Sequence, residues 1–140
     1  MSTPFGPQLI GETEKTLNTI LRRILEATGL TEPEWVTLRL AGQLDGAVDH
    51  DGLARAVADR ARFTDAADLV DALTRRGLVV EGHLTDDGER LVETVQTEIA
   101  ATTAPVWQDL LPDDVAATAR VLNEVVARAR QVIATQPADA

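Results

Sequence analysis

The stretch of the sequence with the most evident chemical potential is residues 64–79, TDAADLVDALTRRGLV. It contains three aspartates, followed by the adjacent arginines Arg75 and Arg76. Guanidinium groups bind phosphate, whereas carboxylates repel it unless they accept a hydrogen bond from a group such as the amino group of cytosine. The stretch therefore indicates one of two surfaces: a helix that contacts nucleic acid through a few cations, or an acidic helix face that is only solvated.

The charge around this stretch disfavours nucleic-acid binding. Residues 51–90 hold six arginines and nine acidic residues, which leaves a net charge of −3, and the whole chain has a formal net charge of −10. Domains that bind DNA are usually basic, because much of their affinity comes from neutralising phosphates. Binding to DNA therefore depends on where the cations lie and not on how many there are.

Other chemistry has less support in the sequence. Cysteine is absent, and the two histidines, His50 and His83, occur on separate expected loops without the spacing of metal ligands. No nucleophile, base and orienting group form a recognisable pattern, and no glycine-rich phosphate loop is present. We therefore expect neither an enzyme nor a bound metal or cofactor.

The composition is that of one globular unit. Hydrophobic residues make up 44% of the 140 residues and aromatic residues only 3%, so the core must consist of Leu, Val, Ile and Ala. No apolar stretch approaches the ~20 residues that span a bilayer, and the N-terminus lacks the features of a secretory signal. These features predict a cytoplasmic protein without a membrane partner.

Helical spacing of apolar residues and capping residues define the first two elements. A helix is expected over residues 8–28 and a second one over 31–42. Thr31 is suited to the N-cap of the second helix, and Glu34 can close a capping box with it. Pro33 is compatible with a first helical turn.

A helix-turn-helix is expected next. Asp51 is predicted to cap a third helix, Arg62-Phe63 to form the turn, and Thr64 to cap the fourth helix, which carries the stretch quoted above. At ~100° per residue, the apolar face of the fourth helix holds Ala66, Leu69, Val70 and Leu73, and the opposite face holds Thr64, Ala67, Asp68, Asp71 and Arg75. Asp71 and Arg75 have the i,i+4 spacing of a favourable ion pair.

A short hairpin follows the fourth helix. Residues 77–85, GLVVEGHLT, form two short apolar arms around a turn at Glu81-Gly82. Ala47-Val48 can form a further short strand in the connection between the second and third helices. A small β-structure beside the helix-turn-helix is therefore expected.

Two long helices are expected at the end of the chain. Thr85 caps the first of them, which extends toward Trp107, and LLPDD separates it from a final helix over 113–133. The final helix carries an apolar stripe of Val115, Leu122, Val125, Val126, Ala129 and Ile133. This surface exceeds what a small core can cover, so we expect it to be buried against a second copy of the chain.

Four segments of the chain, in this order, resemble the multiple-antibiotic-resistance regulator (MarR) family of bacterial winged-helix proteins. The segments are GLTEPEWVTLRLAG, LVDALTRRGLV, LTDDGERLVE and LLPDDVAATARVLNEVV. The resemblance implies a mostly α fold with a small β-hairpin wing, that is, a winged helix-turn-helix with N- and C-terminal dimerisation helices. Residues 1–140 would form a single unit, in which 31–85 are the winged helix-turn-helix and 1–30 and 86–133 the dimerisation helices.

The same resemblance implies a homodimeric transcriptional regulator that binds double-stranded DNA and responds to a small molecule. The residues expected to contact DNA are Arg60, Arg62, Thr64, Ala67, Asp68, Arg75, Arg76 and His83. Trp35, Leu38 and Arg39 are expected to form one wall of a cleft for a small aromatic or anionic effector. For Trp35, the alternative is a core tryptophan that anchors helix packing.

Two departures from the family pattern support a second hypothesis. The hairpin is cut to VVEGHL, with Glu81 at the turn where the family usually has a longer wing with an arginine near its tip. The segment DRARFTDAAD also replaces the usual Ser/Thr- and Arg/Lys-containing entry to the recognition helix, with what looks like a small insertion before it. The second hypothesis is a MarR-like module that binds a small molecule or a protein and has lost DNA binding.

Overall fold

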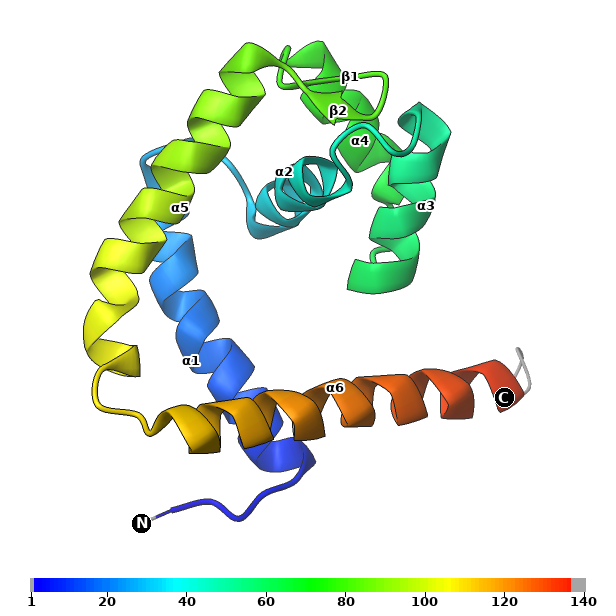
Figure 1. Ribbon diagram of the computed structural model, residues 1–140. Helices are drawn as coiled ribbons and strands as arrows, with labels where there is room; N and C mark the ends of the chain where they lie inside the picture. The colour runs from blue at the N-terminus through cyan, green and yellow to red at the C-terminus, as the bar shows by residue number, and fades with distance from the viewer. Residues whose placement is uncertain (1, 137–140) are drawn as a thin grey trace. The chain divides into compact units, whose positions relative to one another are not determined.

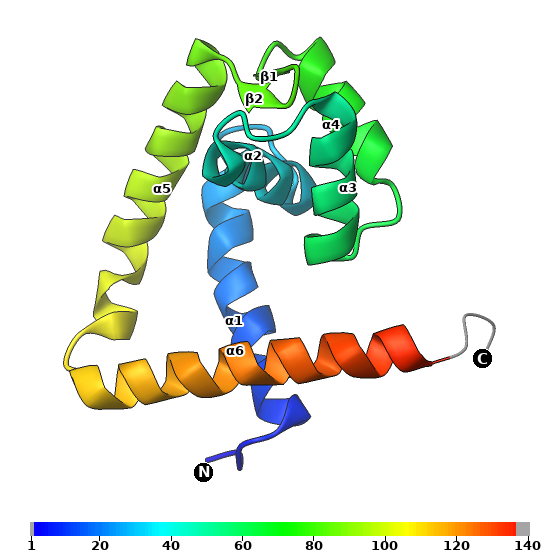
Figure 2. The same ribbon diagram turned by 45° about the vertical axis from the view of Figure 1, so that its right-hand side comes forward.

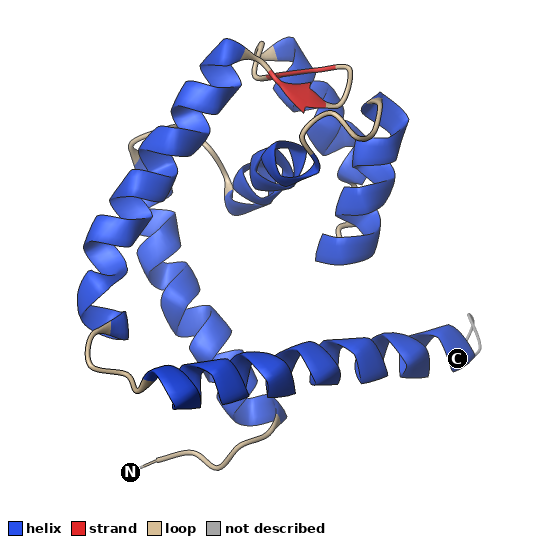
Figure 3. Ribbon diagram, viewed as in Figure 1, coloured by secondary structure: helices blue, strands red, loops and turns tan. Residues whose placement is uncertain are grey.

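The structure is a computed structural model that describes residues 2–136. Over this range six helices and one two-stranded hairpin follow one another (Figures 1 and 3). They are α1 (Pro7–Glu26), α2 (Glu32–Leu44), α3 (His50–Ala61), α4 (Ala66–Arg75), β1 (Val79–Val80), β2 (His83–Leu84), α5 (Asp86–Trp107) and α6 (Pro112–Thr135). This architecture confirms the predicted mostly helical fold with a small wing; residues 1 and 137–140 of the predicted unit 1–140 lie outside the described residues.

The chain divides into two compact units, Met1–Thr102 and Thr103–Ala140. The first unit contains α1 to α4, the hairpin and most of α5, and the second contains the end of α5 and α6. The predicted division into a winged helix-turn-helix at 31–85 and dimerisation helices on either side concerns assembly. It remains a prediction for the single chain.

One hydrophobic core holds the first unit together. Its buried residues are Leu25, Leu30, Trp35, Leu38, Leu40, Ala41, Leu53, Val57, Ala66, Val70, Leu73, Leu78, Val79, Val92 and Val95. These residues come from all five helices of the unit and from the hairpin. Trp35 is the largest of them and is only 1% exposed, so α2 contributes the bulkiest side chain to the core.

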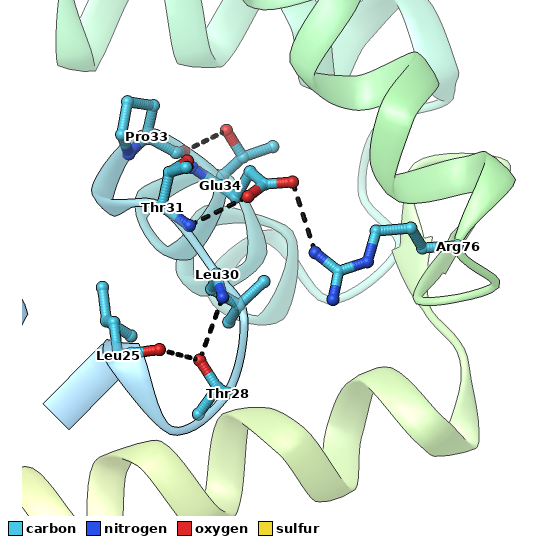
Figure 4. A network of polar contacts seen from close by, with 8 residues as sticks. Leu25, Thr28, Leu30, Thr31, Pro33, Glu34 and Arg76 are labelled. Carbon is cyan, nitrogen blue, oxygen red and sulfur yellow. Dashed lines mark hydrogen bonds and ion pairs between the residues drawn. The ribbon is translucent and has the colours of Figure 1, made fainter.

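The start of α2 has the predicted capping box (Figure 4). The backbone N–H of Glu34 donates to Thr31 Oγ1 at 3.3 Å, and the backbone N–H of Thr31 donates to Glu34 Oε1 at 2.9 Å. Two of the N–H groups at the start of the helix are thus satisfied by side chains. Pro33 lies in the first turn, also as predicted.

The N-caps of α3 and α4 differ from those predicted. Asp49, and not Asp51, caps α3, because its Oδ1 accepts a 2.8 Å hydrogen bond from the backbone N–H of Gly52. The residue before α4 is Asp65 instead of Thr64, and its side chain makes no capping hydrogen bond. The sequence offers several capping side chains at each start, and the path of the preceding loop decides which of them reaches the helix.

The hairpin forms around the predicted turn. Val79 is paired with Leu84 and Val80 with His83 in antiparallel register. Both residues of the turn have positive φ, 51° at Glu81 and 84° at Gly82, as a type I′ turn requires. The two-residue loop therefore keeps the wing short.

The expected strand at Ala47-Val48 is absent, because this segment is irregular between α2 and α3. It supports the wing in another way. A Cβ atom on Gly82 would lie 2.4 Å from the carbonyl oxygen of Val48 and 2.6 Å from that of Asp49. The tip of the hairpin is therefore packed directly onto the loop that caps α3.

Helix α5 has the bounds expected from the sequence, and α6 begins one residue before and ends two residues after the expected range 113–133. Thr85 caps α5, since its Oγ1 accepts a 3.1 Å hydrogen bond from the backbone N–H of Gly88. In the second unit, the indole Nε1 of Trp107 donates to Thr103 Oγ1 at 3.1 Å. No residue of α6 is buried within the single chain.

Candidate nucleic-acid interface

Helices α3 and α4 lie side by side and form a helix-turn-helix (Figures 1 and 2). Arg62 ends α3 with a φ of 60°, in the left-handed region, so the chain turns sharply before Asp65. The inner face of α4 is that predicted from helical spacing: Ala66, Val70 and Leu73 are buried, and Leu69 is partly buried. Because these residues anchor α4, its opposite face is directed outward.

The residues predicted to contact DNA all have exposed side chains. They are Arg60, Arg62, Thr64, Ala67, Asp68, Arg75, Arg76 and His83. Seven of them belong to α3, α4 or the segments that flank α4, and His83 belongs to β2. Their exposure makes contact with a ligand possible. Arg76, however, already forms an ion pair within the chain, and among the described residues the other side chains of this set do not.

Asp71 is paired with a residue of α3. His50 Nε2 lies 2.9 Å from Asp71 Oδ1, with the two side chains 36% and 51% exposed. The expected ion pair between Asp71 and Arg75 does not form. Asp71 is paired instead with His50, at the start of α3. One of the two carboxylates near the centre of the outer face is thus held by an imidazole.

Arg76 is also committed within the chain (Figure 4). Its Nη1 lies 3.3 Å from Oε2 of Glu34, the same carboxylate that closes the capping box of α2. The contact ties the end of α4 to the start of α2. A phosphate would therefore have to compete with Glu34 for the guanidinium group of Arg76.

Three arginines and one aspartate of the predicted set have no such partner. Within residues 2–136, no ion pair engages Arg60, Arg62, Arg75 or Asp68. The two arginines near the end of α3 and the one at the end of α4 leave three guanidinium groups available for phosphates. Asp68 in the first turn of α4 and Asp65 just before it are exposed, unpaired carboxylates that these cations must outweigh.

The predicted effector residues divide between the core and a cleft. Trp35 and Leu38 are 1% and 0% exposed, as the alternative of a core tryptophan expects. Arg39 lines a cleft of about 350 Å³ together with the end of α2, His83 and Leu84 of the hairpin, and the first half of α5. Arg39 and His83 were predicted to serve different ligands, but the structure brings them to one cleft.

A second cleft was missed in the sequence. It has a volume of about 430 Å³ and lies between α1 and α5, lined by Ile20, Arg23, Ile24, Ala27, Thr28, Thr94, Val95, Glu98 and Thr102. Its walls are mainly apolar, with Arg23 and Glu98 as the charged residues. The sequence shows an apolar stripe on each of these two helices. The distance between α1 and α5 depends on how they pack, which the spacing of apolar residues does not determine.

In the part of the chain that the structure describes, no group of three or more His, Asp or Glu residues could hold a metal ion. None of the helices described is both long and apolar enough to cross a membrane. The outer face of α4 and its flanking residues are therefore the candidate functional surface.

The packed pair α3 and α4, followed by a hairpin, defines a winged helix-turn-helix protein. Residues 23–136 match a helix-turn-helix family, and because this match spans most of the chain, the protein belongs to that family. Membership supports a DNA-binding regulator in general.

A solved structure shows the same fold. It is described as a protein of unknown function from Listeria innocua Clip11262, and it is similar with a TM-score of 0.63 and 17% sequence identity. The similarity covers 85% of this chain and 88% of that chain. At this identity the likeness concerns the fold alone. No curated protein matches the sequence.

Proposed function

We propose that the protein is a MarR-like, homodimeric transcriptional regulator that binds double-stranded DNA and responds to a small molecule. The observation that carries the proposal is the outward face of α4, flanked by the unpaired arginines Arg60, Arg62 and Arg75. A recognition helix lies in the major groove with its N-terminal residues at the base edges, while flanking cations contact phosphates. The exposed side chains of this chain have the types and positions for both tasks.

The net charge of −10 does not prevent this arrangement, because screening limits the reach of distant charges. At physiological ionic strength the Debye length is ~8 Å, so acidic residues far from the groove act weakly on the DNA. Of the two carboxylates on the outer face of α4, Asp71 lies 2.9 Å from His50. In the region that would meet the duplex, the unpaired arginines Arg60, Arg62 and Arg75 therefore lie near two unpaired aspartates, Asp65 and Asp68.

Homodimerisation is supported by α6. The residues Val115, Thr118, Leu122, Val125, Ala129 and Val132 follow the alternating spacing of three and four of a heptad stripe. Val115, Val125 and Val132 are 49%, 38% and 55% exposed in the single chain. A helix with no buried residue gains little stability in water, so packing the stripe against a second copy supplies what the chain lacks.

An antiparallel pairing of the two α6 helices fits the charges of the helix. Asp113 and Asp114 lie in its first turn, and Arg128 and Arg130 lie near its end. In antiparallel order the acidic start of one helix is next to the basic end of the other, and the helix dipoles are also opposed. In this order Val115 meets the partner's Val132, and Leu122 meets the partner's Val125.

The effector is proposed to be a small aromatic or anionic molecule. Arg39 supplies a cation in the cleft formed by α2, the hairpin and α5, and an anionic ligand would have to bind it in the presence of Asp45, Glu89 and Glu93, which line the same cleft. A ligand there would touch the wing through His83 and would also touch α5, which is one of the proposed dimerisation helices. Binding would thus alter the spacing of the two recognition units.

The direct test is an electrophoretic shift with the DNA upstream of the protein's own gene, at low salt. We expect a shift at protein concentrations where scrambled DNA of equal length stays free. A control variant, R60A/R62A/R75A, should lose the shift without unfolding. Equal binding of both DNA molecules, or none of either, contradicts the proposal.

The acidic face of α4 supports one alternative: a MarR-like module that binds a small molecule or a protein and no longer engages DNA. Asp68 and Asp71 are both exposed on that face, and Arg76 is tied to Glu34. Under this alternative the native protein binds no DNA, and D68K/D71K creates affinity where there was none. Tight binding of a defined operator by the native protein excludes it.

A further inference from the structure

The two carboxylates on the outer face of α4 are not equivalent. Asp71 is bonded to His50, whereas no ion pair or hydrogen bond engages the Asp68 side chain among the described residues. Asp68 lies in the first turn of α4, directly after the exposed Ala67. The first turn is the part of a recognition helix that reaches the base edges. An unpaired acid is therefore placed where sequence is read.

The chemistry of a carboxylate restricts which base it can meet. An ionised carboxylate only accepts hydrogen bonds. In the major groove cytosine presents a donor, its N4 amino group, while guanine presents two acceptors and thymine an acceptor and a methyl group. Adenine presents a donor next to an acceptor, so it suits a carboxylate less well than cytosine does. Asp68 should thus favour one base and be repelled by two others.

We propose that Asp68 is a specificity-determining residue that accepts a hydrogen bond from a cytosine amino group in each half-site, with the methyl group of Ala67 against a neighbouring thymine. The inference rests on the proposed function and refines it. It also explains why an acidic residue can be tolerated on the groove-facing side of α4. At a cytosine Asp68 forms a charge-assisted hydrogen bond, and at other bases it opposes binding, so it contributes more to discrimination than to affinity.

Asp68 also has a structural role available, because an acid in the first turn of a helix interacts favourably with the helix dipole. If this were its only role, removing the carboxylate of Asp68 would lower the stability of the protein by the same amount whatever DNA is offered. A change in base preference cannot arise from it. The test therefore has to measure which base is selected as well as how tightly the protein binds.

The experiment is selection of binding sites from random duplexes by the full-length native protein, D68N and D71N. Asparagine pairs with adenine through N6 and N7, so D68N should change the selected base from cytosine to adenine at one position of each half-site. D71N is the matched control, because Asp71 is held by His50, and it should keep the cytosine. In the native protein, replacing that cytosine should weaken binding roughly 5- to 100-fold.

Each outcome has a defined meaning. The same base preference for native protein and D68N overturns the inference but leaves the proposed function intact. Failure of the native protein to enrich or bind any duplex removes the proposed function and the inference with it. Circular dichroism of each variant verifies folding, and if D68N does not fold, D68S should bind with the cytosine preference lost.

Discussion

The imidazole Nε2 of His50 lies 2.9 Å from Oδ1 of Asp71, and this contact joins the first turn of α3 to the middle of α4. It is the side-chain bridge between the two helices of the helix-turn-helix. A further contact, from Arg76 to Glu34 at 3.3 Å, ties the end of α4 to the start of α2. Both contacts use charged groups that would otherwise be available to a ligand.

The bridge between His50 and Asp71 should contribute little to stability. Its side chains are 36% and 51% exposed, and exposed ion pairs are typically worth about 0–1 kcal/mol. A double-mutant cycle with H50A, D71A and the double variant, followed by urea unfolding, should give a coupling energy in that range. A coupling well above it would show that the bridge is a major element of the fold.

The two tryptophans should differ strongly when truncated. Trp35 is 1% exposed and Trp107 is 53% exposed. We expect W35A to lower the free energy of unfolding by about 3–5 kcal/mol, because it leaves a large cavity in the core. W107A is the matched control and should cost much less under conditions where the protein is monomeric. Similar losses for both variants would contradict the placement of Trp35 in the core.

The tip of the wing should depend on the absence of a side chain at Gly82. Gly82 and Gly77 both have positive φ, but an added Cβ would meet backbone atoms only at Gly82 and open space at Gly77. G77A should cost about 1 kcal/mol from backbone strain alone. G82A should cost clearly more in thermal or urea unfolding, since the wing must also move off the loop before α3. Equal losses would mean that the wing is not packed there.

The proposed dimer should be sensitive to charge in the α6 stripe. Val125 belongs to the stripe, whereas Ala127 lies on the opposite side of the helix. V125D should convert the protein to a monomer in light scattering at micromolar concentration, and A127D should leave it dimeric. A native protein that is already monomeric at this concentration would contradict the dimer.

Local spacing was sufficient to predict the helices, the turn at Glu81-Gly82 and the capping box between Thr31 and Glu34. Each of these depends on residues within a few positions of one another. The N-caps of α3 and α4 were wrong by one or two residues, because DHD and FTD each offer more than one capping side chain and the loop conformation selects among them.

The side-chain pairs of the candidate site could not be predicted from local spacing. His50 and Asp71 are 21 positions apart, and Arg76 and Glu34 are 42 apart. Their contacts follow from how α2, α3 and α4 pack, and packing is not encoded in spacing. The exposed face of α4 was predictable; which of its charges remain available was not.

The central claim is that three unpaired arginines in each of two recognition units allow an acidic protein to hold DNA. The most direct measurement is the dissociation constant for the selected duplex as a function of salt concentration. Contact with about six phosphates predicts that log K falls with log salt at a slope of about −5, and R60A/R62A/R75A should flatten it. A slope near zero for the native protein, or no binding at low salt, would contradict the claim.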